Sequence, residues 1–190
     1  MDTVEPIRDK GMILDIADYL LEINERDYVL FMFGIYSGLR ISDILPLKVR
    51  DVRNADYIYL REKKTGKEKR FPINDELKSI LKRYIKGKRD YELLFPNNRK
   101  DIMQRKPISR QRVWSILNEA AQAMGYSEKI GCHTLRKTFG YWLYQNTHDA
   151  VAIQEILNHS DISITKRYIG VNQDSKDKIM NGLSFRRRSR

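Results

Sequence analysis

The chain has 190 residues, 41% of them hydrophobic, which is enough for one globular core and too little for two full domains. Lys and Arg number 36 against 25 Asp and Glu, and the net charge of +11 indicates a polyanionic partner, with nucleic acid as the first candidate. A basic surface without such a partner would give the same composition. The single cysteine, Cys132, excludes an intramolecular disulfide.

The N-terminus and the apolar runs bear on localisation. The first ten residues lack the apolar core of a signal peptide. The longest apolar run, residues 28–36, has nine residues, well below the roughly twenty that a membrane-spanning helix needs. We therefore expect a cytoplasmic protein without a membrane segment.

The first third of the chain predicts helices and a turn. Apolar residues recur at three- and four-residue spacing over residues 11–24, which is typical of an amphipathic helix. A second helix is predicted from about Asp27, and Gly38 can end it by adopting a positive φ. Arg40 then follows in a turn, and residues 41–45 predict a short helix.

A hairpin is predicted next. Residues 57–60 and 70–73 have the composition of β-strands, and a Gly-containing turn separates them. Residues 61–70 contain six basic and two acidic side chains, so this turn concentrates positive charge.

Helices are predicted at about 75–86 and 109–124, the latter capped by Ser109. We expect one face of this second helix to be core, and that face contains Trp114, Leu117, Ala121 and Met124.

The last third predicts a helix over about 134–146, a second that Asp149 caps and that ends near Asn158, and a third that Asp161 caps and that carries Tyr168. The fold class is therefore predicted to be mainly α (α+β), a compact helical domain with one small antiparallel sheet.

Several side chains have the chemistry that metal-free cleavage of a phosphodiester needs. Such cleavage requires a nucleophile, positive donors on the nonbridging oxygens and an acid for the departing 5′ oxygen. Arg40 has Asp43 one helical turn away, where the carboxylate could hold the guanidinium, although a surface ion pair is the commoner explanation. His133 and Arg136 stand at i and i+3 where a helix opens and could face one anion, although a helix cap with a solvated arginine would look the same.

The order of four motifs along the chain is more specific evidence of function than any of these residues alone. The segments SGLRISDIL, KKTGK, HTLRKTF and LNHSDISITKRY follow one another along the chain. Together they resemble the catalytic domain of tyrosine recombinases of the phage integrase type, over roughly residues 10–180. The resemblance implies cleavage and rejoining of DNA strands through a 3′-phosphotyrosyl link, without a metal or any other cofactor.

The resemblance also implies a role for each matching residue. The phosphate ligands and the nucleophile are Arg40, His133, Arg136, His159 and Tyr168, with Tyr168 as the nucleophile. Lys64 in the hairpin turn is the implied general acid, and Lys63 and Lys67 are alternatives.

The chain departs from the family at two points. Asn158 stands where Gly is usual before the second histidine, and Asp43 stands where Glu is common behind the first arginine. Asn tolerates the left-handed conformation that Gly would supply, so we expect the turn before His159 to be preserved.

A second basic segment is a candidate for DNA contact. Residues 99–112 contain six basic side chains and one acidic one. A solvated helix face would explain this charge equally well for any single residue. The predicted DNA-binding side chains are Lys63, Lys67, Arg105, Lys106, Arg110 and Arg112.

The predicted organisation is one catalytic domain over residues 1–185, with a tail helix at about 172–182 and a basic, disordered tail at 186–190. The N-terminal core-binding domain common in the family is not expected in this sequence, which fits either a fragment or a short natural form. The resemblance implies double-stranded DNA as partner, a homotetramer on two duplexes with the tail docked in cis or in trans, and a directionality factor as a further candidate partner. The alternative functions are type IB topoisomerase-like strand resealing and noncatalytic binding of DNA.

Overall fold

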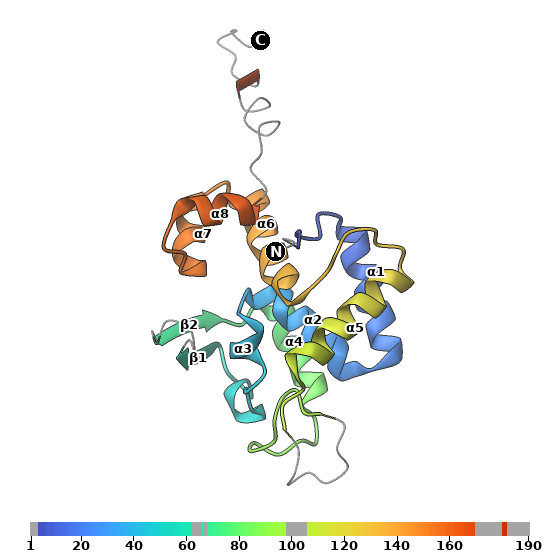
Figure 1. Ribbon diagram of the computed structural model, residues 1–190. Helices are drawn as coiled ribbons and strands as arrows, with labels where there is room; N and C mark the ends of the chain where they lie inside the picture. The colour runs from blue at the N-terminus through green and yellow to red at the C-terminus, as the bar shows by residue number, and fades with distance from the viewer. Residues whose placement is uncertain (1–3, 62–65, 67, 98–105, 170–179, 182–190) are drawn as a thin grey trace, which may run out of the picture.

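The computed structural model describes residues 4–61, 66, 68–97, 106–169 and 180–181. The described part is mainly helical with one two-stranded antiparallel sheet, which confirms the predicted fold class. In chain order its elements are α1 (Lys10–Ile23), α2 (Glu25–Ser37), α3 (Ile41–Ile44), the 3₁₀ helix η1 (Val49–Asp51), β1 (Tyr57–Arg61), β2 (Glu68–Pro72), α4 (Asp75–Tyr84), α5 (Arg110–Ala123), α6 (Cys132–Thr147), α7 (Ala150–Leu157) and α8 (Ile162–Ile169) (Figure 1).

Side-chain caps fix where the later helices begin. Ser109 Oγ accepts from the backbone N–H of Arg112 at 3.1 Å, and Asp149 Oδ1 caps α7 in the same way. Asp161 Oδ1 accepts from the backbone N–H of Ser163 at 2.6 Å in the first turn of α8. These three predicted caps are confirmed. By contrast α2 begins slightly earlier than predicted, because Asn24 caps it.

The hairpin buries one face and exposes the other. In its register Ile58 pairs with Phe71, and both side chains are buried against the helical body. Their neighbours Tyr57 and Tyr59 point to the opposite face, as alternation along a strand requires, and are exposed. The predicted strands are therefore confirmed, with β2 beginning two residues before its predicted start.

Helix α2 is the centre of the main core and packs closely on α6. A Cβ atom at Gly34 would clash with Leu135, and one at Gly38 would clash with Phe139, one turn further along both helices. Glycine at these positions lets the two helices approach closely. This contact brings the end of α2 to the helix that carries His133 and Arg136.

The prediction that Trp114 is core is wrong. The side chain is 52% exposed, whereas Leu117 and Ala121 of the same helix are buried and Met124 is partly buried. The face of α5 that packs inward is shifted, with Val113 and Ile116 buried beside Leu117. Trp114 instead lies near the backbone of Gly131, at the start of α6.

A second, smaller cluster holds α7 and α8 on α6. Its buried members are Ile153, Leu157 and Ile169, and Tyr168 packs against them. Helices α7 and α8 lie on the same side of the molecule as the hairpin, above it in Figure 1. None of the described helices is long and apolar enough to cross a membrane.

Candidate active site

A left-handed turn presents Arg40. Gly38 closes α2 with φ 60° and ψ 13°, as predicted, and its N–H donates to the carbonyl of Gly34 at 3.1 Å. Arg40 follows as the residue before α3, in an extended conformation and partly buried. Asp43 lies one turn into α3 and is buried, so both predicted residues belong to this turn. A positioning role of Asp43 toward Arg40 stays a prediction.

Arg136 is the largest of the fully buried side chains in the described structure and is 2% exposed. Its Nη1 donates to the carbonyl oxygen of Gly38 at 2.6 Å, and its Nη2 donates to that of Leu157. One guanidinium therefore ties the turn before Arg40 to the end of α7, which comes just before His159. Because a guanidinium has five N–H donors in a planar fork, it can bridge two carbonyls in this way.

His133 lies in the first turn of α6 with part of its surface in solvent. Partial burial is the largest cause that lowers its pKa, and the positive charges of Arg110, Arg136, Arg40 and Lys137 lower it further. Arg136 and Lys137 lie one turn away on α6 itself, whereas the tertiary structure brings Arg110 and Arg40 near His133. The neutral imidazole is therefore favoured near neutral pH.

The turn after α7 brings His159 to Tyr168. Asn158 adopts the left-handed conformation, with φ 51° and ψ 49°, as the departure from Gly predicted. His159 Nδ1 is 2.9 Å from Thr165 Oγ1 of α8, a hydrogen bond that fixes the ring against this helix. The ring centroids of His159 and Tyr168 are then 4.5 Å apart in an edge-to-face arrangement.

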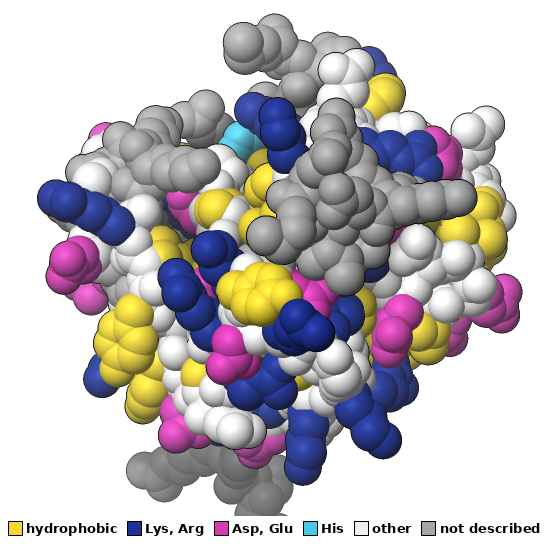
Figure 2. Space-filling model, turned by 90° about the horizontal axis from the view of Figure 1, so that it is seen from below, with side chains coloured by type: hydrophobic (Ala, Val, Ile, Leu, Met, Phe, Trp, Pro, Cys, Tyr) yellow, Lys and Arg dark blue, Asp and Glu magenta, His cyan; other side chains and the backbone are white. Residues whose placement is uncertain are grey.

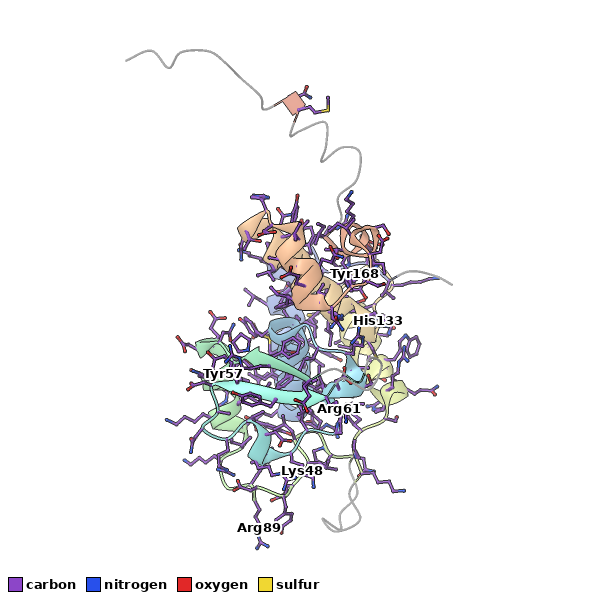
Figure 3. The ribbon with its side chains drawn as sticks, turned by 90° about the vertical axis from the view of Figure 1, so that its left-hand side faces the viewer. Lys48, Tyr57, Arg61, Arg89, His133 and Tyr168 are labelled. Carbon is purple, nitrogen blue, oxygen red and sulfur yellow. The ribbon has the colours of Figure 1, made fainter. Side chains whose placement is uncertain are left out.

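The small residue Gly140 gives Tyr168 its place on α6. A Cβ atom at Gly140 would lie 3.3 Å from Leu157 Cδ1, which is a tight contact, and 3.8 Å from Tyr168 Cβ, which is an ordinary van der Waals distance. Figure 3 shows Tyr168, His133 and Arg61 following one another along the side of the molecule that carries the sheet. The described part of the predicted site thus comes together from α3, α6, the turn after α7, and α8.

Other predicted residues are placed differently or not described. Lys63, Lys64, Lys67 and Arg105 lie outside the described residues, as does the predicted tail apart from residues 180–181. Lys106 and Arg110 are exposed, and Arg110 is close enough to His133 to influence its pKa. Arg112 is also exposed, but its Nη1 donates to Glu119 Oε1 at 3.0 Å on its own helix.

Comparison with known proteins decides the family. The model of the phage integrase family matches residues 10–175. The chain belongs to the phage integrase family. The members are tyrosine-type site-specific recombinases, so the enzyme class implied by the four motifs is confirmed.

Relatives of this integrase-family chain differ in length. It is 50% identical over 186 residues to the probable integrase/recombinase YoeC of Bacillus subtilis (strain 168), covering 96% of this chain and 100% of that relative. It is 33% identical over 167 residues to the tyrosine recombinase XerD of Oceanobacillus iheyensis (strain DSM 14371 / CIP 107618 / JCM 11309 / KCTC 3954 / HTE831), covering 83% of this chain but only 56% of XerD. The chain thus spans about half of the XerD proteins.

Solved recombinases share the fold of this integrase-family chain. The crystal structure of XerA recombinase superposes with a TM-score of 0.75 at 20% identity, covering 96% of this chain and 68% of XerA. XerH site-specific recombinase, bound to palindromic difH substrate in a post-cleavage complex, gives a TM-score of 0.72 at 19% identity over 95% of this chain and 54% of XerH.

Sequence reasoning missed three residues that shape this integrase-family site. Thr165 bonds His159, Gly140 makes room for Tyr168, and Lys137 places its ammonium 5.6 Å from the centre of the Tyr168 ring. A lysine predicted on a helix is normally assigned to solvent, so the sequence pattern around Lys137 held no signal. Gly140 lies inside a predicted helix, where a glycine can indicate that another element packs closely against the helix. Within the described residues, no three His, Cys, Asp or Glu side chains form a group that could hold a metal ion.

Proposed function

We propose that the chain cuts and rejoins DNA strands through a covalent 3′-phosphotyrosyl intermediate at Tyr168. The hydroxyl oxygen of Tyr168 attacks the scissile phosphorus, the bond from phosphorus to the 5′ oxygen breaks, and a 5′ hydroxyl leaves. A second 5′ hydroxyl attacks the phosphotyrosine in reverse and releases Tyr168. The phosphoester bond is conserved, so the cycle needs no nucleotide.

The remaining residues have separate roles in this proposal. Arg40 and Arg136 bind the nonbridging oxygens, where their charge stabilises the pentavalent phosphorane. His133 accepts the proton of Tyr168: its lowered pKa keeps the ring in the neutral form that can accept a proton, although it also makes the ring a weaker base. Lys64 protonates the departing 5′ oxygen. Asp43 orients Arg40, and His159 donates a hydrogen bond to the phosphate.

One observation carries the proposal: the contact of the His159 and Tyr168 rings beside the helix that bears His133 and Arg136. The ring centroids are 4.5 Å apart, and a Cβ atom placed on Gly140 of α6 would lie 3.8 Å from Tyr168 Cβ. Of the tyrosines in the chain, this one therefore lies next to the predicted phosphate ligands. Tyr144 also contacts a histidine ring, that of His148, but His148 is not among the predicted phosphate ligands whereas His159 is.

The proposed partner is double-stranded DNA. XerH is bound to its difH substrate and Lambda Integrase to DNA, and both resemble this fold. The net charge of +11 supports the same partner. We further propose that the domain over residues 1–185 acts as a homotetramer on two duplexes, with the tail docked in cis or on a neighbouring protomer, and that a directionality factor selects the outcome.

Covalent capture tests the proposal. Wild type and Tyr168→Phe are incubated with supercoiled and nicked DNA in EDTA, and adducts that survive denaturant are separated by electrophoresis. We expect an adduct in the wild type alone, because Phe lacks the attacking oxygen. An adduct that persists in Tyr168→Phe would refute the nucleophile.

A further inference from the structure

Lys137 is a buried charge beside the proposed nucleophile. It follows Arg136 on α6 and is 8% exposed. Its Nζ donates to the carbonyl oxygen of Val4 at 2.7 Å and lies 5.6 Å from the centre of the Tyr168 ring. Moving an ammonium out of water costs free energy unless nearby groups compensate, and both of these contacts contribute to that compensation.

The contact with Val4 ties Lys137 to the N-terminal end of the described chain. Val4 belongs to an N-terminal segment, residues 4–8, that runs along α6, and we call it the strap. Ile7 of the strap donates its backbone N–H to Thr138 Oγ1 at 2.9 Å and accepts from Trp142 Nε1 at 3.0 Å. Both bonds hold the strap on α6 without placing a charge in the protein. The ammonium differs from these two groups in lying near the face of Tyr168.

We infer that Lys137 is a positioning residue for Tyr168. Its ammonium, anchored on the Val4 carbonyl, attracts the ring and restricts the directions in which the hydroxyl can point. Nucleophilic attack is sensitive to such orientation, because a misdirected hydroxyl must pay the entropy of alignment in every turnover. This inference rests on the proposed function of Tyr168.

Three substitutions separate positioning from packing. Lys137→Met keeps an unbranched stem and removes the charge, and Lys137→Arg keeps the charge. Trp142→Phe is the matched control, which removes the hydrogen bond from Trp142 to Ile7 of the strap and leaves Lys137 intact. We expect Lys137→Met to lower the single-turnover rate of adduct formation at saturating DNA by about tenfold. Lys137→Arg should recover part of the rate, and Trp142→Phe should keep the wild-type rate, while the Kd for DNA stays unchanged in all three.

Two outcomes would contradict the positioning role of Lys137. If Lys137→Met and Trp142→Phe lower the rate equally and in step with their loss of Tm, Lys137 only fastens the strap. If a substrate with sulfur in place of the bridging 5′ oxygen restores the rate of Lys137→Met, Lys137 supplies a proton rather than orientation, since a thiolate leaves without one. Either result would overturn the inference.

A measurement without DNA keeps the inference testable even if no adduct forms in the wild type. The protein is labelled with 3-fluorotyrosine, and the Tyr168 resonance is identified by its absence in Tyr168→Phe. We expect this resonance to shift and broaden in Lys137→Met and to stay in place in Trp142→Phe. An unchanged Tyr168 resonance in Lys137→Met would refute the positioning role independently of any activity.

Discussion

The Arg136 guanidinium is almost removed from solvent and donates to carbonyls of two separate turns, at Gly38 and Leu157. These carbonyls lie in the segments that precede Arg40 and His159. The residue therefore has a structural role in the protein without DNA, in addition to the proposed contact with phosphate. Loss of cleavage on its removal would have two physical causes at once.

Arg136→Ala should lower the free energy of unfolding by about 3 kcal/mol, because it leaves two buried carbonyls without this donor and opens a cavity. Arg40→Ala removes a partly buried side chain at a turn and should cost much less stability. Urea denaturation monitored by circular dichroism measures both. We expect both variants to lose adduct formation, with the folded Arg40→Ala retaining salt-sensitive DNA binding; wild-type cleavage by Arg40→Ala would remove it from the site.

His133 gives the stability a pH dependence. Burial and surrounding cations lower its pKa in the folded protein, so the unfolded chain binds a proton more readily. The stability that His133 contributes is present above its pKa in the unfolded chain, about 6.5, and is lost as pH falls through its pKa in the folded protein. Between pH 7 and pH 5 we expect Tm to fall more in the wild type than in His133→Asn, measured by calorimetry at constant ionic strength. Parallel pH profiles would contradict this.

At the scale of elements, α7 and α8 are held differently from the rest. They pack on α6 through a cluster of three buried residues, Ile153, Leu157 and Ile169, whereas α2 is surrounded by the main core. Segments with little buried apolar surface open at lower free energy than the global unfolding. The helix with the proposed nucleophile therefore belongs to the part that opens first.

Hydrogen exchange followed by mass spectrometry should detect this difference. We expect backbone amides of α8 to exchange faster than those of α2, and Leu157→Ala to accelerate α7 and α8 with little effect on α2. Ile58→Ala, which empties a site in the main core beneath the hairpin, is the control and should destabilise the body instead. Uniform protection across α2 and α8 would show that the two clusters open together.

The helices show which structural features local sequence patterns were sufficient to predict. The caps Ser109, Asp149 and Asp161 and the left-handed residues Gly38 and Asn158 were predicted, because capping and backbone conformation depend on neighbours a few residues away. The packing face of α5 was predicted wrongly at Trp114. Spacing gives a helix an apolar stripe, but the partner that covers it is set by the tertiary structure.

For the whole molecule, we expect the net charge of +11 to govern the proposed association with DNA. Figure 2 shows Lys and Arg side chains spread over the face seen from below, with Asp and Glu between them. Binding should weaken as salt rises, because each neutralised phosphate releases counterions.

The slope of log Kobs against log[salt] distinguishes bound from solvated arginines. Arg110→Gln should reduce its magnitude by about one, because Arg110 lies beside His133 and its contact with a phosphate would be lost. Arg112→Gln is the matched control on the same helix and should change the slope less, since Arg112 is paired with Glu119 at 3.0 Å. Equal slopes for wild type and Arg110→Gln would assign Arg110 to the solvated face.

The sequence by itself determined the family and the order of the elements and predicted most residues of the candidate site, because motifs, caps and periodicity are local. Only the tertiary structure decided how they meet. The Arg136 bond to Gly38 spans 98 residues of chain and the Ile7 bond to Thr138 spans 131, and such contacts depend on how α2, α6 and the strap pack. For the same reason the burial of Lys137 against Tyr168 could not be predicted: a lysine enters a protein interior only where distant groups compensate its charge.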